Sequence, residues 1–249
     1  MEALNMSIEK VALVTGGSRG IGAAIARRLA GDGLPVALTY SASPDRADQV
    51  VREIEHAGGR ALSLRADAAD PDAATAAVER TVSALGRLDV LVSNAGVAAA
   101  GPVEALEPEQ IDRMIDVNVR GVLHAIRAAL PHIGEGGRII TIGSMIADRV
   151  PFAGGAAYAM TKAAVAGLVR GLARDLGPRG VSVNNIQPGP TANDSMSADS
   201  PAADGMLPWL ALPRIATPDE IAGLVSYLAG PEAGYITGAS LTIDGGFTA

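Results

Sequence analysis

With 249 residues, 48% of them hydrophobic and only 3% aromatic, the chain suits a single α/β domain, residues 1–249, whose core is built from Ala, Val, Leu and Ile. Its formal net charge of −7 and the lack of any run of Lys or Arg exclude the charge pattern of a nucleic-acid-binding protein. The sequence has no Cys, and its three scattered His residues complete no ligand set, so neither disulfides nor a metal site is expected.

Strands and helices alternate along the sequence, beginning with residues 11–15, a continuous apolar run typical of a strand buried on both faces of a parallel sheet. The predicted strands are 11–15, 35–40, 61–64, 88–93, 138–144, 181–186 and 240–243. The predicted helices are 21–30, 45–57, 70–85, 108–130, 155–176 and 218–228. Because helices connect successive strands, the pattern predicts a Rossmann-type, doubly wound and mainly parallel seven-stranded sheet flanked by helices.

The first strand breaks into a glycine-rich turn, and a helix follows at once. A backbone that turns sharply and admits a pyrophosphate cannot carry Cβ atoms at the closest points, and the N–H groups of the following helix add partial positive charge. Taken alone, the turn also fits a plain structural role, and its spacing is not G-x-G-x-x-G. Read as a dinucleotide phosphate site, it includes Gly16, Ser18, Arg19, Ile21 and Gly22.

Small or polar residues also follow four later predicted strands. They are Asp67, Asn94, Ser144 and the pair Pro188-Gly189. Because the carboxyl ends of parallel strands meet at one edge of the sheet, these residues and Ser18 are expected to line the same rim. Ligands of doubly wound sheets bind at this edge, near the switch in strand order.

Tyr158 and Lys162 lie four residues apart in a predicted helix, so their side chains share one face and can meet. A phenol has an ordinary pKa of about 10, and a nearby ammonium lowers that pKa by favouring the phenolate. Tyr158 is therefore expected to give a proton to a carbonyl oxygen or to take one from an alcohol. Ser144, at a strand end, could donate a hydrogen bond to the same oxygen. Each of the three residues, taken alone, also fits an ordinary structural role.

Six motifs in one order carry a resemblance to a known family: Thr15-Gly16-x-x-x-Gly20-x-Gly22, Asn94-Ala95-Gly96, Asn118, Ser144, Tyr158-x-x-x-Lys162 and Pro188-Gly189. In order and spacing they resemble the short-chain dehydrogenase/reductase family over nearly the whole chain. The branch that looks most similar is that of the 3-oxoacyl-thioester and carbonyl reductases. The resemblance implies an oxidoreductase that moves hydride between a nicotinamide cofactor and a carbonyl, with Asn118, Ser144, Tyr158 and Lys162 as its catalytic residues.

The resemblance also implies roles for residues that the spacing alone does not explain. Asn118 would hold a water that links Lys162 to solvent. The run Asn94-Ala95-Gly96 would support the central sheet and leave passage for the cofactor, which Tyr158 and Lys162 would also contact. Asp67 would bond the amino group of adenine.

One position departs from the family pattern. The family commonly has a threonine five positions after the proline of its Pro-Gly motif, where it bonds the nicotinamide carboxamide. This sequence has Asn193 there, and the nearest hydroxyl belongs to Thr191. Either residue could serve as the donor, so the choice stays open.

The segment after the second strand bears on the choice of dinucleotide. An NAD site usually places Asp or Glu about 20 residues beyond the glycine turn, where it accepts from the ribose 2′-hydroxyl. Residues 39–43 contain no such acid. The side chains that could bind a 2′-phosphate are those of Arg19, Ser41, Ser43 and Arg46. NADPH is therefore favoured over NAD, and Asp45 is the residue that could reverse this preference.

Residues 190–215, hereafter the 190–215 segment, show no clear period and are predicted to be a substrate lid. Their apolar members, among them Met206 and Trp209, indicate a pocket for an apolar ketone or the matching alcohol. The choice among an acyl thioester, a ketoester and a plain ketone stays open. The alternative is that this segment packs on the sheet or on a neighbouring subunit. Arg149 and Arg214 could bind an anionic tail of the substrate.

Further expectations concern assembly and location. The family resemblance and the Ala-rich helix 155–176 predict a homotetramer of D2 symmetry, with a dimer as the alternative. Residues 1–6 lack a basic segment followed by an apolar core, and no apolar stretch reaches the length of a membrane span, so a cytoplasmic protein without a membrane partner is expected. A nucleotide-binding or regulatory protein of the same fold, without relevant turnover, is the rival functional hypothesis.

Overall fold

Seven parallel strands form one sheet in the order β3-β2-β1-β4-β5-β6-β7, which confirms the predicted fold class. The structure is a computed structural model, and it describes residues 10–194, 196–197 and 199–249. The prediction for residues 1–6 therefore lies outside the described residues. The strands are β1 (Ala12–Val14), β2 (Val36–Tyr40), β3 (Ala61–Arg65), β4 (Val90–Ser93), β5 (Arg138–Ile142), β6 (Ser182–Pro188) and β7 (Ser240–Ile243).

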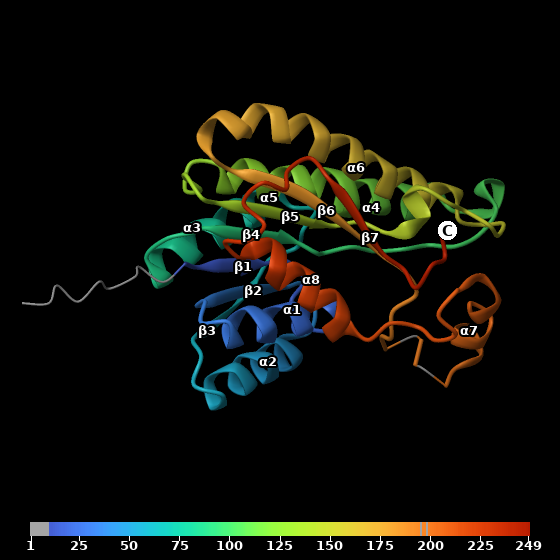
Figure 1. Cartoon of the computed structure of the whole chain (residues 1–249), viewed down its shortest axis with the longest axis horizontal. Coiled ribbons are helices and arrows are strands. Elements are labelled where there is room, and N and C mark those ends of the chain that lie inside the picture. The colour runs from blue at the N-terminus through green and yellow to red at the C-terminus, as the bar shows by residue number, and fades with distance from the viewer. Residues whose placement is uncertain (1–9, 195, 198) are drawn as a thin grey trace, which may run out of the picture.

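Helices cover both faces of this sheet (Figure 1). One face carries α1 (Gly20–Gly31), α2 (Pro44–His56) and α8 (Pro218–Ala229). The other carries α3 (Pro71–Leu85), α4 (Pro108–Ile115), α5 (Gly121–Ala129) and α6 (Ala156–Leu176). The short helix α7 (Pro201–Asp204) lies at the end of the molecule where the 190–215 segment projects.

The continuous apolar runs of the strands follow from this double cover. In β1, Ala12 and Val14 pack into the core beneath α1, α2 and α8, whereas Leu13 packs into the core beneath α3, α5 and α6. Successive side chains of a strand point to opposite faces, so a strand covered on both sides must be apolar at every position. Two cores therefore hold the sheet from opposite sides.

The strand order reverses between β1 and β4, which are hydrogen-bonded neighbours. From β1 the chain builds outward through β2 to β3, and then returns to build β4 through β7 on the other side. The loops after β1 and β4 thus diverge at their carboxyl ends. This divergence opens the crevice in which doubly wound sheets bind their ligands.

Three details differ from the sequence-based expectations. The predicted helix 108–130 contains a π-helical turn, η2 (Asp116–Arg120), between α4 and α5. The sixth strand runs on to Pro188, which pairs with Ile243, so this proline ends the strand instead of following it. The 190–215 segment holds regular structure after all, in α7 and the short helix η5 (Leu207–Trp209), each with a proline near its start where the missing N–H costs nothing.

No helix in the described part of the chain is long and apolar enough to cross a membrane. Nor do three His, Cys, Asp or Glu side chains gather there in a way that could hold a metal ion.

Candidate active site

A cleft of about 570 Å³ opens at the carboxyl ends of the central strands. Most of the predicted site residues line it. Asn118 is buried behind it. Five residues that the sequence proposed for phosphate or substrate binding do not line it: Ser43, Arg46, Arg149, Trp209 and Arg214. The lining residues that the sequence singled out are Gly16, Ser18, Arg19, Ile21, Gly22, Ser41, Asp67, Asn94, Ala95, Gly96, Ser144, Tyr158, Lys162, Pro188, Gly189 and Thr191.

The glycine turn between β1 and α1 is fixed by close backbone contacts. A Cβ atom on Gly22 would lie 2.3 Å from the Gly16 carbonyl oxygen and 2.4 Å from the Asn94 amide nitrogen, which no real packing tolerates. Gly16 itself has φ +65°, the left-handed region that favours glycine. The helix that follows has no acidic residue in its first turn, so its N–H groups and partial positive charge remain available to an anion.

Thr15 and Asn94 join this turn to the loop after β4. The backbone N–H groups of Asn94 and Ala95 donate to Thr15 Oγ1 at 3.0 and 3.1 Å, and the Asn94 amide donates back to the Thr15 and Gly16 carbonyl oxygens. The Gly16 N–H donates to Thr39 Oγ1 on β2 at 3.1 Å. These contacts satisfy polar groups on three neighbouring strands, so the cleft floor is pre-formed.

Ser144, Tyr158 and Lys162 gather where β5 and α6 meet at the cleft. Ser144 follows β5 and begins the short helix η3 (Met145–Ala147), where its hydroxyl accepts from the Ile146 N–H at 3.3 Å. Lys162 is buried, and its Nζ donates to the Ile142 carbonyl oxygen at 2.9 Å. Nζ lies 5.7 Å from the centroid of the Tyr158 ring. The helical spacing therefore brings the two side chains together as expected.

The pKa values differ from the expectation that Lys162 favours the Tyr158 phenolate. Burial raises the pKa of Tyr158 to about 12 and outweighs a hydrogen bond with Ser144 that lowers it. Burial likewise lowers the pKa of Lys162 to about 8. Desolvation penalises the charged form of each group, the phenolate of Tyr158 and the ammonium of Lys162. The expectation that Lys162 lowers the pKa of Tyr158 was wrong: Tyr158 is a neutral phenol at neutral pH and can donate its proton.

Asn118 lies in the π-helical turn η2 and is buried. Its amide nitrogen donates to the Val97 carbonyl oxygen at 2.8 Å and to Thr161 Oγ1 at 3.1 Å, and its amide oxygen accepts from the Val97 N–H at 2.9 Å. The Thr161 hydroxyl in turn donates to the Tyr158 carbonyl oxygen. A π-helical turn inside an α-helix often marks a functional site, and this one ties Asn118 to the helix that carries Tyr158.

Gly96 separates Asn118 from Lys162. A Cβ on Gly96 would stand 3.4 Å from the Asn118 amide oxygen and 3.5 Å from Lys162 Nζ. Both polar groups thus border the same small space beside the cleft. The role of Asn118 in holding a water at this point stays a prediction.

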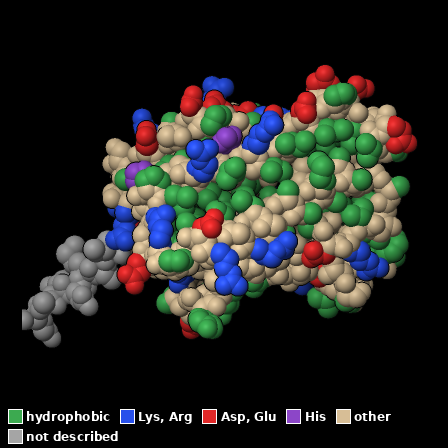
Figure 2. Space-filling model, turned by 90° about the horizontal axis from the view of Figure 1, so that it is seen from above, with side chains coloured by type: hydrophobic (Ala, Val, Ile, Leu, Met, Phe, Trp, Pro, Cys, Tyr) green, Lys and Arg blue, Asp and Glu red, His purple; other side chains and the backbone are tan. Residues whose placement is uncertain are grey.

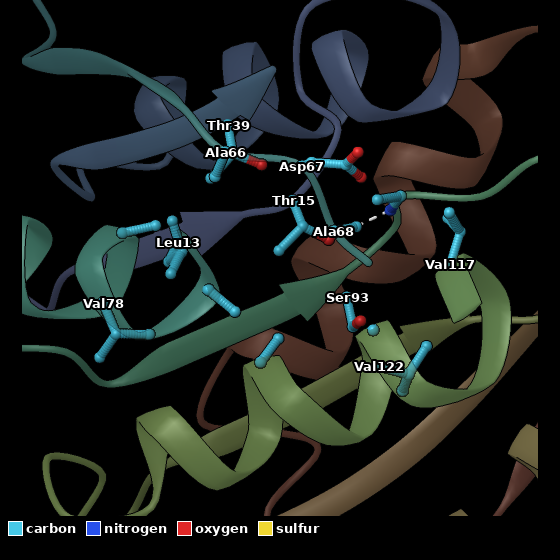
Figure 3. Close-up of a pocket in the computed structure, with 15 residues that line it drawn as sticks. Leu13, Thr15, Thr39, Ala66, Asp67, Ala68, Val78, Ser93, Val117 and Val122 are labelled. Atoms are coloured by element: carbon cyan, nitrogen blue, oxygen red, sulfur yellow. Dashed lines mark hydrogen bonds between the residues drawn. The ribbon is translucent and has the colours of Figure 1, made fainter. Parts of the chain in front are cut away.

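In the loop after β3, the Asp67 carboxylate accepts hydrogen bonds from the Arg113 guanidinium at 2.9 and 3.1 Å and from the Ala69 N–H at 3.0 Å. The hydrogen bond with Arg113 holds the pKa of Asp67 below its ordinary value although burial opposes it. A recess of about 20 Å³ lies beside this carboxylate. Figure 3 shows Leu13 and Val78 on the side of this recess away from Asp67. Small and apolar side chains thus line this recess next to a fixed carboxylate.

Arg19, at the start of α1, faces a carboxylate that the sequence analysis did not consider. Its guanidinium stands 3.4 Å from the Asp194 carboxylate, and Arg46 of α2 donates to the same oxygen. Ser41 lines the cleft near these residues. No acidic residue of the loop after β2 lines the cleft, among the residues that the structure describes.

Two residues compete for the carboxamide role near Gly189. The Thr191 hydroxyl donates to the Gly189 carbonyl oxygen at 2.9 Å, and the Asn193 amide donates to the Thr191 carbonyl oxygen at 3.1 Å. Both residues line the cleft. The alternatives left open by the sequence are therefore still open.

Sequence reasoning missed three residues of this site: Thr161, Arg113 and Asp194. Each acts through a partner far away in the chain, since Thr161 bonds Asn118, Arg113 pairs with Asp67 and Asp194 pairs with Arg19. Thr161 offered one signal, because it lies next to Lys162 in the Tyr-x-x-x-Lys helix. Nothing in the sequence pattern pointed to Arg113 or Asp194.

The chain is similar to known proteins over nearly its whole length. A family model described as Enoyl-(Acyl carrier protein) reductase matches residues 16–248. A cyclic-di-GMP-binding biofilm dispersal mediator protein of Escherichia coli (strain K12) is 45% identical over 96% of this chain and 98% of its own. A 3-oxoacyl-(acyl-carrier-protein) reductase of Staphylococcus aureus is 38% identical over 97% and 99%. A short-chain dehydrogenase of Burkholderia cenocepacia J2315, solved in complex with NADP, is 52% identical with a TM-score of 0.94 over 96% of this chain and 98% of its own.

Proposed function

The chain belongs to the short-chain dehydrogenase/reductase family, as a member of the 3-oxoacyl reductase type, and we propose that it reduces a ketone to a secondary alcohol with NADPH. One observation carries the proposal: a neutral phenol, a hydroxyl and a buried amine meet at the cleft, in Tyr158, Ser144 and Lys162. These are the groups that proton transfer to a carbonyl oxygen requires. The reaction is reversible, since the same groups catalyse alcohol oxidation.

In the proposed mechanism, NADPH supplies the hydride when it is bound. Tyr158 donates its phenolic proton to the carbonyl oxygen as negative charge develops there. The Ser144 hydroxyl donates a hydrogen bond to the same oxygen and stabilises that charge. Lys162, held against the Ile142 carbonyl oxygen, places an ammonium behind the phenol and stabilises the phenolate that remains. Asn118 fixes the helix that carries Tyr158 through Thr161.

The choice of NADPH rests on charge. The glycine turn and the start of α1 offer a cradle for a pyrophosphate, and the adjoining Arg19 and Arg46 already hold a carboxylate between them. A guanidinium that binds one anion suits a phosphate at the same position. The B. cenocepacia structure, in complex with NADP, supports the same choice. Asp67 would accept a hydrogen bond from the adenine amino group, because its carboxylate oxygens can accept further bonds besides those from Arg113.

The proposed substrate is an apolar ketone. Met145, Met196 and Met206 line the cleft, and the last two come from the 190–215 segment, which we propose as the lid of this single domain. The two arginines that could have bound an anionic tail are already engaged. Arg149 donates to the Phe247 carbonyl oxygen and stands 5.8 Å over its ring, and Arg214 makes two bonds of 2.7 and 2.8 Å with Glu220. An uncharged substrate therefore suits the cleft better than one with an anionic tail.

A kinetic screen tests the proposed function. Purified protein is assayed at 340 nm with aliphatic, aromatic and keto-ester ketones, each with NADPH and with NADH, and Tyr158→Phe is measured in parallel. We expect turnover of at least one ketone, faster with NADPH, that disappears in Tyr158→Phe. Activity no higher than that of the variant on every compound would refute the enzyme proposal.

A second candidate function is nucleotide-dependent regulation. The observation in its favour is the 45% identity to the E. coli protein named for binding cyclic di-GMP. Titration calorimetry with cyclic di-GMP separates the two candidates. Binding at micromolar concentration without turnover of any ketone would favour the regulatory role.

We also propose a D2 homotetramer, in which α5 and α6 form a helix-pairing interface. Figure 2 shows hydrophobic side chains gathered on the face of the molecule that carries these helices. Leu123 of α5 and Met160 of α6 are exposed large hydrophobic residues, and Ala164 and Gly167 of α6 are exposed small residues that permit close helix approach. A cytoplasmic location stays a prediction.

Light scattering after size exclusion tests the assembly. We expect a mass four times that of the 25.1 kDa chain. Ala164→Arg should lower this mass, because a long charged side chain prevents close helix pairing. Ala57→Arg, an exposed position after α2, is the matched control and should leave it unchanged. A monomer in all three proteins would refute the tetramer.

A further inference from the structure

The Asp194 carboxylate lies between two cations that come from distant parts of the chain. Arg19 belongs to the glycine turn and Arg46 to α2, whereas Asp194 belongs to the 190–215 segment. All three residues border or adjoin the cleft, and their side chains are between 48% and 67% exposed. These ion pairs thus connect the 190–215 segment to the end of the cleft where we place the 2′-phosphate.

This contact has little value for the stability of the fold. Ion pairs between exposed side chains contribute little, because water screens the charges and long side chains lose freedom. The hydrogen bond from Arg46, with the nearby Arg19, nevertheless holds the pKa of Asp194 below its ordinary value, so the carboxylate is charged at neutral pH. A full negative charge of the chain itself therefore occupies the position between the two guanidinium groups.

We propose that Asp194 is a specificity-determining residue, whose carboxylate competes with the 2′-phosphate of NADPH for Arg19 and Arg46. This inference rests on the proposed function, because it takes NADPH as the cofactor. The phosphate must displace the carboxylate, since both bind the same guanidinium groups. NADH has no 2′-phosphate and leaves the Asp194 contact intact.

Two consequences follow from the competition. NADPH binding must break the contact of Asp194 with the two arginines, and this cost lowers the affinity for NADPH. Removing the charge of Asp194 should therefore tighten NADPH binding and leave NADH binding unchanged. Displacement also releases the 190–215 segment from α1 and α2, so the 2′-phosphate should change the surroundings of that segment. The phosphate carries more negative charge at neutral pH than a carboxylate, which lets it win the exchange.

The chain provides both a matched control and a reporter for this test. Asp204 lies in α7 of the same segment and takes part in no ion pair among the residues that the structure describes, so Asp204→Asn removes the same charge without touching the arginines. Trp209 is the only tryptophan of the chain and lies in η5, within the segment. Its fluorescence therefore reports on this segment alone.

The experiment measures binding of adenosine 2′,5′-bisphosphate, 5′-AMP, NADPH and NADH by calorimetry in the full chain, Asp194→Asn and Asp204→Asn. We expect Asp194→Asn to bind NADPH and the bisphosphate about 2- to 10-fold more tightly, as the loss of one or two exposed ion pairs implies. NADH and 5′-AMP should bind all three proteins equally. The bisphosphate should shift the Trp209 emission of the unsubstituted chain, and that shift should be smaller in Asp194→Asn.

Other outcomes overturn the inference. Equal NADPH affinity in Asp194→Asn and Asp204→Asn would exclude the competition, and weaker binding in Asp194→Asn would mean that the carboxylate orients the arginines for the phosphate. Tighter binding with an unmoved Trp209 emission would exclude release of the segment. Failure of the proposed function has a different signature: a chain that binds NADPH as predicted but reduces no ketone retains the inference and loses the enzyme proposal.

Discussion

The two ends of the cleft differ in how far their side chains are exposed to solvent. Where Ser144, Tyr158 and Lys162 meet, Lys162 is only 5% exposed, and Ser144 and Tyr158 are half-buried. Where Arg19 and Arg46 meet Asp194, the two arginine side chains are 67% and 52% exposed. One end lies against the sheet, whereas the other lies on surface turns and on the first residues of two helices.

This difference decides what each end can do. Burial moves the pKa of Tyr158 up to about 12 and that of Lys162 down to about 8, because a charge without water is costly. Exposed charges are screened, so contacts of Arg19 can be exchanged at small cost. The buried end is therefore suited to chemistry and the exposed end to selecting the cofactor.

The largest expected effect comes from Tyr158→Phe, which removes the proton donor at the buried end. We expect kcat for ketone reduction to fall by about 100- to 10,000-fold, the usual contribution of general acid catalysis. The dissociation constant for NADPH should change little. Tyr227→Phe, at an exposed position on α8, is the control. A kcat within twofold of the original would rule out the assigned role.

Lys162→Met tests the buried ammonium. Because burial lowers the pKa of Lys162 to about 8, the ammonium is present below that pH and lost above it. In the unsubstituted enzyme kcat/KM for reduction should therefore fall as pH rises through about 8. Lys162→Met should lower the rate about 100-fold at neutral pH, as loss of a transition-state charge partner does, and should remove this decline. A decline of the same shape in the variant would assign the titration to another group.

Gly22→Ala tests the glycine turn that both ends share. The added methyl would stand 2.3 Å from the Gly16 carbonyl oxygen, and overpacking of this kind costs about 1–3 kcal/mol of the free energy of unfolding. Urea denaturation measures this change. Gly31→Ala, at the last residue of the same helix, has no atom within 4 Å of its new Cβ and should leave stability unchanged or slightly raised. Equal stability of the two variants would disprove the steric argument.

The smallest expected effect in this series is that of Arg19→Ala at the exposed end. The variant should bind NADPH about 10-fold more weakly, the loss expected for one hydrogen bond to a charged group. NADH binding should stay within about twofold, because the missing contact is to the 2′-phosphate. Arg52→Ala, an exposed position on α2, controls for net charge. If both dinucleotides lose affinity equally, Arg19 reads the shared pyrophosphate instead.

Much of the buried end was predictable from sequence. Tyr158 and Lys162 lie one helical turn apart, so local geometry alone brings them together. Ser144 follows a strand whose apolar run marks it as central, and parallel strands end at one edge. The exposed end was less predictable, because Asp194 reaches Arg19 across 175 residues through a segment without a regular pattern.

The sequence by itself determined the alternation of strands and helices, the glycine turn and those residues of the cleft that directly follow the strands, because these follow from local periodicity and from the common edge of a parallel sheet. Only the tertiary structure decided the ionisation of Tyr158 and Lys162, the π-helical turn at Asn118 and the pairing of Asp194 with Arg19 and Arg46. The physical reason is that desolvation and charge pairing depend on atoms brought together from distant parts of the chain. Local pattern places a group on an element, but its surroundings set its chemistry.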